Sequence, residues 1–177
     1  MLSQKDLKDL EEWIRSDCFM EGRFEISDGG FVESYINMFP ITIQYEKSSL
    51  VSWLLNGIIM DNNWLPDILF GKELHGSLIA SNLVRDCRPL HDLGIIRKSD
   101  ELIYNRACAV PSAILLDDVI STGVNMRNSI QLLRDNDFWV EGVVCVVYRG
   151  GGAKEECENM GIPFESILEI PEVITYD

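Results

Sequence analysis

Basic residues are scarce in this chain of 177 residues, and the shortage excludes several classes of function. Fifteen lysines and arginines stand against 29 aspartates and glutamates, which gives a net charge of −14 at pH 7. Proteins that wrap nucleic acid or lie on an anionic membrane need a basic surface, so we expect neither kind of partner. An anionic substrate then has to be held by backbone amides, a helix terminus and a few placed cations.

Long apolar runs and paired cysteines are also missing. The most apolar stretch, residues 50–60, is shorter than the roughly 20 residues of a membrane-spanning helix. Residues 1–15 alternate charged and apolar side chains, unlike a secretory signal. The five cysteines form no Cys-x-x-Cys pair and have no histidine at metal-ligand spacing, which suits reduced thiols. We therefore expect a cytoplasmic protein.

The length and the patterning predict one domain of the α/β class. With 46% hydrophobic residues and no internal repeat or low-complexity segment, residues 1–177 can bury a single core. Short apolar segments alternate with helical patterns, as in βαβ units that build a parallel sheet. The continuous valine-rich run at 140–148 predicts a strand buried on both faces.

One stretch organises the rest of the chain. Apolar residues 113–116 predict a buried strand, and Asp117 and Asp118 follow at its end. The small residues at 121–123 let backbone N–H groups approach an anion, and the helix pattern behind them adds positive partial charge. The carboxylates would repel a phosphate, so we expect them to meet hydroxyl groups or a metal. The stretch predicts a ribose 5-phosphate site, whereas solvated acids before an ordinary turn would explain the aspartates alone.

Residues 115–123 resemble the motif by which type I phosphoribosyltransferases bind 5-phosphoribosyl 1-pyrophosphate (PRPP). The resemblance runs from about residue 22 to residue 170 and is to the orotate phosphoribosyltransferases above all. It implies a central, mostly parallel sheet flanked by helices, with a small hood built from about 22–40 and 149–177. It also implies transfer of ribose 5-phosphate from PRPP to a nucleobase, an orotate-like pyrimidine, with release of pyrophosphate. A homodimer is the implied assembly.

The resemblance assigns roles to residues along the chain. Asp117 and Asp118 hold the ribose hydroxyls and stabilise an oxocarbenium-like transition state, with Lys98 as a third catalytic residue. Phe31 and Arg149 fall at base-binding positions. Mg²⁺ is the expected cofactor, carried on PRPP near the two aspartates rather than held directly by the protein. The residues expected to bind PRPP are Asp117, Asp118, Val119, Ile120, Ser121, Thr122, Gly123, Val124, Asn125, Lys72, His75, Arg97 and Lys98.

The pyrophosphate contacts are expected from a loop at 71–76. Two glycines flank this stretch between a strand and a helix, so that backbone N–H groups can reach an anion. Lys72 adds a charge there, and His75 is either a ligand-binding residue or an ordinary surface histidine.

A lid is expected after the strand at 93–96, which delivers Arg97 and Lys98. In the orotate enzymes a similar strand begins a mobile lid over PRPP. Here a second lysine of that lid falls on Glu101 and a histidine on Ile103, and Arg106 is a further cation nearby. These changes leave open a PRPP- or nucleotide-binding regulatory or partner protein that has lost catalysis.

The hood departs from the family pattern as well. Phe31 stands where the orotate enzymes have a lysine that touches the base, and either contacts the base or packs under the hood. Arg149 stands where they have an arginine that pairs with the orotate carboxylate, or else forms a salt bridge with Glu155 or Glu156. A transferase for a different base is therefore a second alternative.

Overall fold

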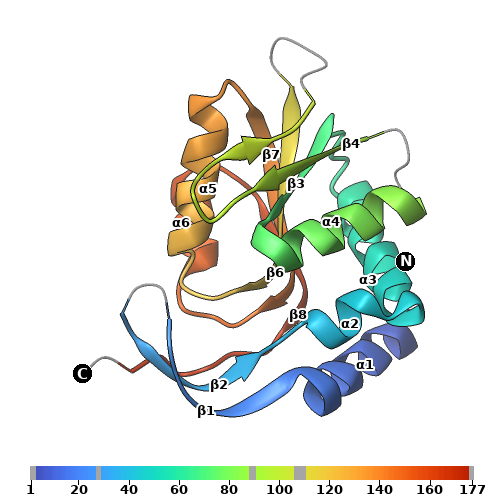
Figure 1. Cartoon of the computed structure of the whole chain (residues 1–177), viewed down its shortest axis with the longest axis vertical. Coiled ribbons are helices and arrows are strands. Elements are labelled where there is room, and N and C mark those ends of the chain that lie inside the picture. The colour runs from blue at the N-terminus through green and yellow to red at the C-terminus, as the bar shows by residue number, and fades with distance from the viewer. Residues whose placement is uncertain (1–2, 27–28, 88–90, 106–110, 176–177) are drawn as a thin grey trace.

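A six-stranded sheet forms the centre of the computed structural model, which describes residues 3–26, 29–87, 91–105 and 111–175 (Figure 1). The strands are β3 (Ile68–Lys72), β4 (Asp92–Ile96), β5 (Leu102–Ile103), β6 (Ser112–Ile120), β7 (Trp139–Tyr148) and β8 (Phe164–Glu169). Their order is β5-β4-β3-β6-β7-β8, and only the edge strand β5 runs antiparallel to its neighbour. The predicted mostly parallel sheet is confirmed.

Helices cover both faces of this sheet (Figure 1). One face packs against α1 (Gln4–Trp13), α3 (Tyr45–Asp61) and α4 (Glu73–Cys87), and the other against α5 (Val124–Asp135) and α6 (Ala153–Asn159). A π-helical turn (Ile14–Cys18) and the short α2 (Phe39–Ile43) link α1 and α3 to the hood. In the part of the chain that the structure describes, no helix is both long and apolar enough to span a bilayer.

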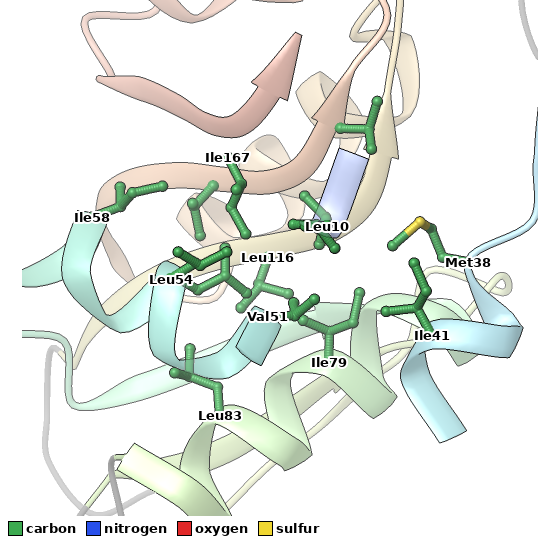
Figure 2. Close-up of a cluster of buried hydrophobic side chains, with 14 of the residues drawn as sticks. Leu10, Met38, Ile41, Val51, Leu54, Ile58, Ile79, Leu83, Leu116 and Ile167 are labelled. Atoms are coloured by element: carbon green, nitrogen blue, oxygen red, sulfur yellow. The ribbon is translucent and has the colours of Figure 1, made fainter. Parts of the chain in front are cut away.

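Alternation along the strands divides the core into two clusters. Ile114 and Leu116 of β6 face the cluster that includes Leu54 and Ile79, shown in Figure 2, whereas Leu115 faces the α5 side. Successive side chains of a strand point to opposite faces, so a strand covered on both sides must be apolar throughout. This is why the sheet segments read as continuous apolar runs.

A separate hairpin, β1 (Phe19–Glu25) and β2 (Phe31–Ile36), lies beside the carboxyl end of the sheet (Figure 1). Ser27 and Asp28, between the two strands, lie outside the described residues. The C-terminal segment runs along β2, where Phe31 and Thr175 exchange backbone hydrogen bonds of 2.7 and 2.9 Å. Two segments far apart in the sequence therefore form the hood together.

β6 is longer than the sequence predicts, and the two aspartates lie inside it. β7 pairs with β6 as far as Ile120, whereas pairing with β3 stops at Leu116. The part of β6 that carries Asp117 and Asp118 thus has a neighbouring strand on one side only. The open side faces the start of α4.

The prediction of a loop at 71–76 is wrong. β3 runs to Lys72 and α4 starts at Glu73, whose φ of +51° makes the reversal in a single residue. A Cβ on Gly71 would lie 2.4 Å from the Gly76 carbonyl oxygen, and one on Gly76 would lie 2.8 Å from the Leu116 oxygen. The glycines therefore let the first turn of α4 pack directly on the sheet.

Candidate active site

A cavity of about 790 Å³ lies at the carboxyl end of the sheet, bounded by β6, the starts of α4 and α5, and the hood hairpin. Open α/β sheets bind their ligands at this end. The residues predicted from the sequence that line the cavity are Lys72, His75, Lys98, Asp117, Asp118, Val119, Ile120, Ser121, Thr122, Gly123, Val124, Asn125 and Arg149. Arg97 and Phe31 do not line it.

The turn after β6 leads into α5 through a glycine. Gly123 has a φ of +84° and is the N-cap of α5, and it has no side chain with which to cap that helix. A Cβ at this position would lie 2.9 Å from the Ala153 Cα, so both the conformation and the space require glycine. Backbone amides at a helix start, together with the helix dipole, bind phosphate groups well.

Lys72 lies beneath this turn. Its side chain is 7% exposed, and Nζ donates to the Ser129 hydroxyl at 2.8 Å and lies 3.5 Å from the Asn125 carbonyl oxygen. The ammonium group thus ties β3 to the first turns of α5. It places a positive charge behind the turn rather than in a pyrophosphate loop.

The two aspartates form the acidic wall of the cavity. Burial raises the pKa of Asp117 well above its ordinary value, and the neighbouring Asp118 carboxylate raises it further. The Asp118 backbone N–H donates to Asp117 Oδ1 at 3.0 Å. Hydroxyl donors or a bound cation would relieve this concentration of negative charge. The pair therefore suits a sugar or a metal-bound ligand.

His75 pairs with Asp118 across the cavity. Nδ1 of the ring lies 3.1 Å from Asp118 Oδ2, and the hydrogen bond to this carboxylate raises the pKa of His75 above its ordinary value of 6.5. A raised pKa in the folded state stabilises the protein below pH 6.5, and this contribution is lost as the pH rises through the folded pKa.

We therefore predict a pH-dependent effect of His75→Gln. The variant is expected to lose about 0.5–1 kcal/mol of unfolding free energy at pH 6, with the loss shrinking as the pH rises above 6.5. Urea denaturation of both proteins from pH 5.5 to 8.5 measures the difference. A difference that stays constant over this range would contradict the ion pair.

The segment expected to be the lid forms a tight hairpin. The Arg97 N–H donates to the Glu101 carbonyl at 3.0 Å, and the Arg97 guanidinium pairs with the Glu101 carboxylate at 2.9 Å. Lys98 and Asp100 reach the cavity wall, whereas Arg97 lines a neighbouring groove. Arg106 lies outside the described residues. The positive charge that Lys98 brings to the cavity is thus opposed by Asp100.

Phe31 and Arg149 both have charged partners in the structure. The Arg23 guanidinium stacks 4.0 Å from the Phe31 ring centroid, in line with the interpretation that Phe31 packs under the hood. Arg149 pairs with Glu172 rather than with Glu155 or Glu156. It is 4% exposed and also donates to the hydroxyl of a β2 serine.

The cavity has few groups that could hold a metal by themselves. Among the described residues, no group of three or more histidine, cysteine, aspartate or glutamate side chains is placed to hold an ion. Mg²⁺ commonly uses one or two carboxylates and takes its other ligands from substrate phosphates and water. Asp117 and Asp118 fit that kind of donor set.

Comparison with known proteins identifies the fold. No family model matches the sequence. A solved structure of Mycobacterium tuberculosis H37Rv orotate phosphoribosyltransferase in complex with inorganic phosphate aligns with a TM-score of 0.80 and 23% identity, covering 94% of this chain and 96% of that chain. The fold is that of the type I phosphoribosyltransferases. The orotate phosphoribosyltransferase of Mycobacterium avium (strain 104) is 25% identical over 179 residues, 97% of this chain and 98% of the relative.

A second structure of the Mycobacterium tuberculosis H37Rv enzyme was determined in complex with PRPP. It aligns with this phosphoribosyltransferase fold at a TM-score of 0.78 and 23% identity, covering 93% of this chain and 96% of that chain. The resemblance seen in the sequence is thus confirmed at the level of fold and of relatives. The roles of the individual residues remain predictions.

The residues that line the cavity of this phosphoribosyltransferase fold but were not predicted as site residues include Ser34, Tyr35, Glu73 and Glu172. Burial raises the pKa of Tyr35, and the two aspartates raise it further, so its hydroxyl stays neutral. Alternation along β2 could have pointed to Ser34, a polar residue on the buried side of the hairpin. No sequence signal marks Glu172, because its place depends on the path of the C-terminal segment.

Proposed function

We propose that the protein transfers ribose 5-phosphate from PRPP to orotate and releases pyrophosphate. The observation that carries this proposal is the wall of the cavity, where the glycine turn at Ser121–Asn125 lies on the same stretch as Asp117 and Asp118. One half suits a phosphate and the other suits ribose hydroxyls. The curated relatives named orotate phosphoribosyltransferase, at 25% identity over nearly the whole chain, support the same reaction.

The carboxylates have an electrostatic role in this mechanism. The bond from C1′ of the ribose to the pyrophosphate oxygen breaks, and a nitrogen of the base forms the new bond to C1′. Positive charge develops on the ribose ring as the pyrophosphate departs, and Asp117 and Asp118, which line the cavity, would stabilise it. The ribose hydroxyls donate to the same carboxylates, which offsets the burial that raises the pKa of Asp117.

The cations have a second role at the pyrophosphate. Lys98 and His75 line the cavity near the start of α4, and Lys72 lies behind the phosphate turn. Asp117 and Asp118 would be the candidate protein ligands of Mg²⁺ that enters with PRPP, and the ion would neutralise part of the pyrophosphate charge. Arg97 takes part only if it leaves Glu101.

The test is turnover with defined substrates. Incubation with orotate, PRPP and Mg²⁺ is expected to yield nucleotide and pyrophosphate in equal amounts, and chelation of Mg²⁺ is expected to stop the reaction. Chromatographic measurement of both products, with a control that lacks the base, separates transfer from hydrolysis of PRPP. Absence of turnover with orotate and with every other pyrimidine or purine would refute the proposal.

The segment expected to be the lid favours one alternative, a PRPP-binding protein without catalysis. Arg97 pairs with Glu101 and does not line the cavity, and Asp100 lines the cavity together with Lys98. Calorimetric binding of PRPP without turnover of any base would support this alternative. The family resemblance also leads us to propose that residues 1–177 form one domain and that the protein is a cytoplasmic homodimer. Sedimentation equilibrium would measure the mass of the assembly and so test the dimer.

A further inference from the structure

One buried arginine lies where the cavity meets the hood. Arg149 follows β7 and lines the cavity, and its Nη2 donates to the Ser34 hydroxyl of β2 at 2.8 Å. Its other terminal nitrogen, Nη1, is buried and has no hydrogen-bond partner in the structure. A guanidinium can bind a carboxylate through two parallel hydrogen bonds, so Arg149 has a donor to spare.

A carboxylate of the same chain already occupies this arginine. Glu172 forms an ion pair with Arg149, and its Oε1 accepts from the Ser34 hydroxyl at 2.6 Å. The Glu172 backbone N–H donates to the Arg149 carbonyl at 2.9 Å. The side chains of Arg149 and Glu172 are 5% and 12% exposed. The ion pair is thus largely shielded from water, and hydrogen bonds from the Ser34 hydroxyl and the Glu172 backbone N–H hold Glu172 in place.

Orotate differs from uracil by one carboxylate, and that group needs a cation. Arg149 lines the cavity and also contacts the hood hairpin through Ser34. A second carboxylate placed beside Glu172 in a buried site would meet a like charge at short range, which is costly. The substrate carboxylate and Glu172 therefore compete for one guanidinium.

We propose that Glu172 is an internal competitor for the substrate carboxylate, and that orotate binds Arg149 when the Glu172 side chain leaves it. The inference rests on the proposed transfer to orotate. Backbone hydrogen bonds at Glu172 and Thr175 fix the segment, so the exchange needs rotation of the side chain alone. The affinity for orotate is then reduced by the fraction of molecules in which Arg149 is occupied, whereas a base without a carboxylate is unaffected.

The variant Glu172→Gln tests this exchange. Its amide keeps the shape and can still bond Ser34, but it competes weakly for a guanidinium. We expect KM for orotate to fall about tenfold, with KM for PRPP and KM for uracil unchanged. Ser34→Ala, which removes a hydrogen bond to Glu172 but keeps both charges, is expected to act in the same direction with a smaller effect.

Glu169→Gln is the matched control, because Glu169 lies on β8 just before this segment and pairs with the exposed Lys154. It is expected to change none of the three constants. Calorimetric titration of orotate into each protein in the presence of pyrophosphate gives a second readout that needs no turnover.

The outcomes separate the two proposals. If Glu172→Gln binds orotate more tightly but neither protein forms nucleotide, the competition stands and the proposed transfer fails. If the wild type forms nucleotide and the variant binds orotate equally or more weakly, the competition is refuted and the transfer stands. Equal changes in KM for orotate and uracil, or no binding of orotate to either protein, would also overturn the competition.

Discussion

Replacing Asp117 with asparagine is expected to lower kcat/KM for PRPP by about 10²–10³-fold while making the ligand-free protein more stable. The carboxylate stabilises positive charge only in the transition state, and lost electrostatic stabilisation of this kind has effects of that size. In the absence of ligand the same carboxylate is partly buried beside Asp118, and both the desolvation and the neighbouring charge raise its pKa. The amide removes this unfavourable charge, which should add about 1 kcal/mol to the unfolding free energy at pH 7.

The raised pKa of Asp117 also determines how the stability difference between the variant and the wild type changes with pH. The pKa of Asp117 is raised in the folded protein above its ordinary value of 3.8, so folding becomes less favourable as the pH rises from there through the folded pKa. The stability difference between Asp117→Asn and the wild type should therefore grow with pH over this window. Thermal denaturation at several pH values measures it, with the exposed Asp135→Asn as a control that changes neither activity nor stability. A variant that is both active and unchanged in stability would contradict the assignment.

Gly71→Ala is expected to destabilise the protein by about 3 kcal/mol and to lower Tm by about 6–12 °C. The new Cβ would lie 2.4 Å from both the Gly76 carbonyl oxygen and the Ser77 Cα, which are backbone atoms and cannot rotate away. The start of α4 would have to move off the sheet. Because His75 lies in that turn, the activity of the folded fraction should fall as well.

Gly161→Ala is the control for this prediction. Gly161 has a φ of +67°, but a Cβ there would meet nothing within 4 Å, so the substitution costs only backbone strain of about 1 kcal/mol. Urea denaturation of the two variants compares the cost of steric overlap at position 71 with the cost of backbone strain at position 161. Equal losses of stability in both would show that the close approach of α4 to β3 is not needed.

The sequence predicts the parts of the fold that rest on local patterns. Residues 113–125 contain the strand, the carboxylates and the glycine turn in one continuous stretch, so their order along the chain already determines their order in space. The parallel sheet follows similarly from continuous apolar runs such as β7, which is buried on both faces. These features need no knowledge of distant contacts.

The features that the sequence does not predict depend on distant partners. β6 extends to Ile120 because β7 pairs with it beyond the end of β3. The partner of Arg149 is Glu172, 23 positions further along the chain, and the pair forms only because the last segment returns across the hood. Lys72 is buried and bonded to Ser129 because β3 includes Lys72 and α5 packs beside the end of that strand.

A crystal structure of the protein with PRPP and Mg²⁺ would show directly whether this cavity is the PRPP site. We expect the 5-phosphate within hydrogen-bonding distance of the backbone amides at Ser121–Asn125, with the ribose hydroxyls against Asp117 and Asp118. PRPP bound elsewhere, or a 5-phosphate directed away from this turn, would contradict it.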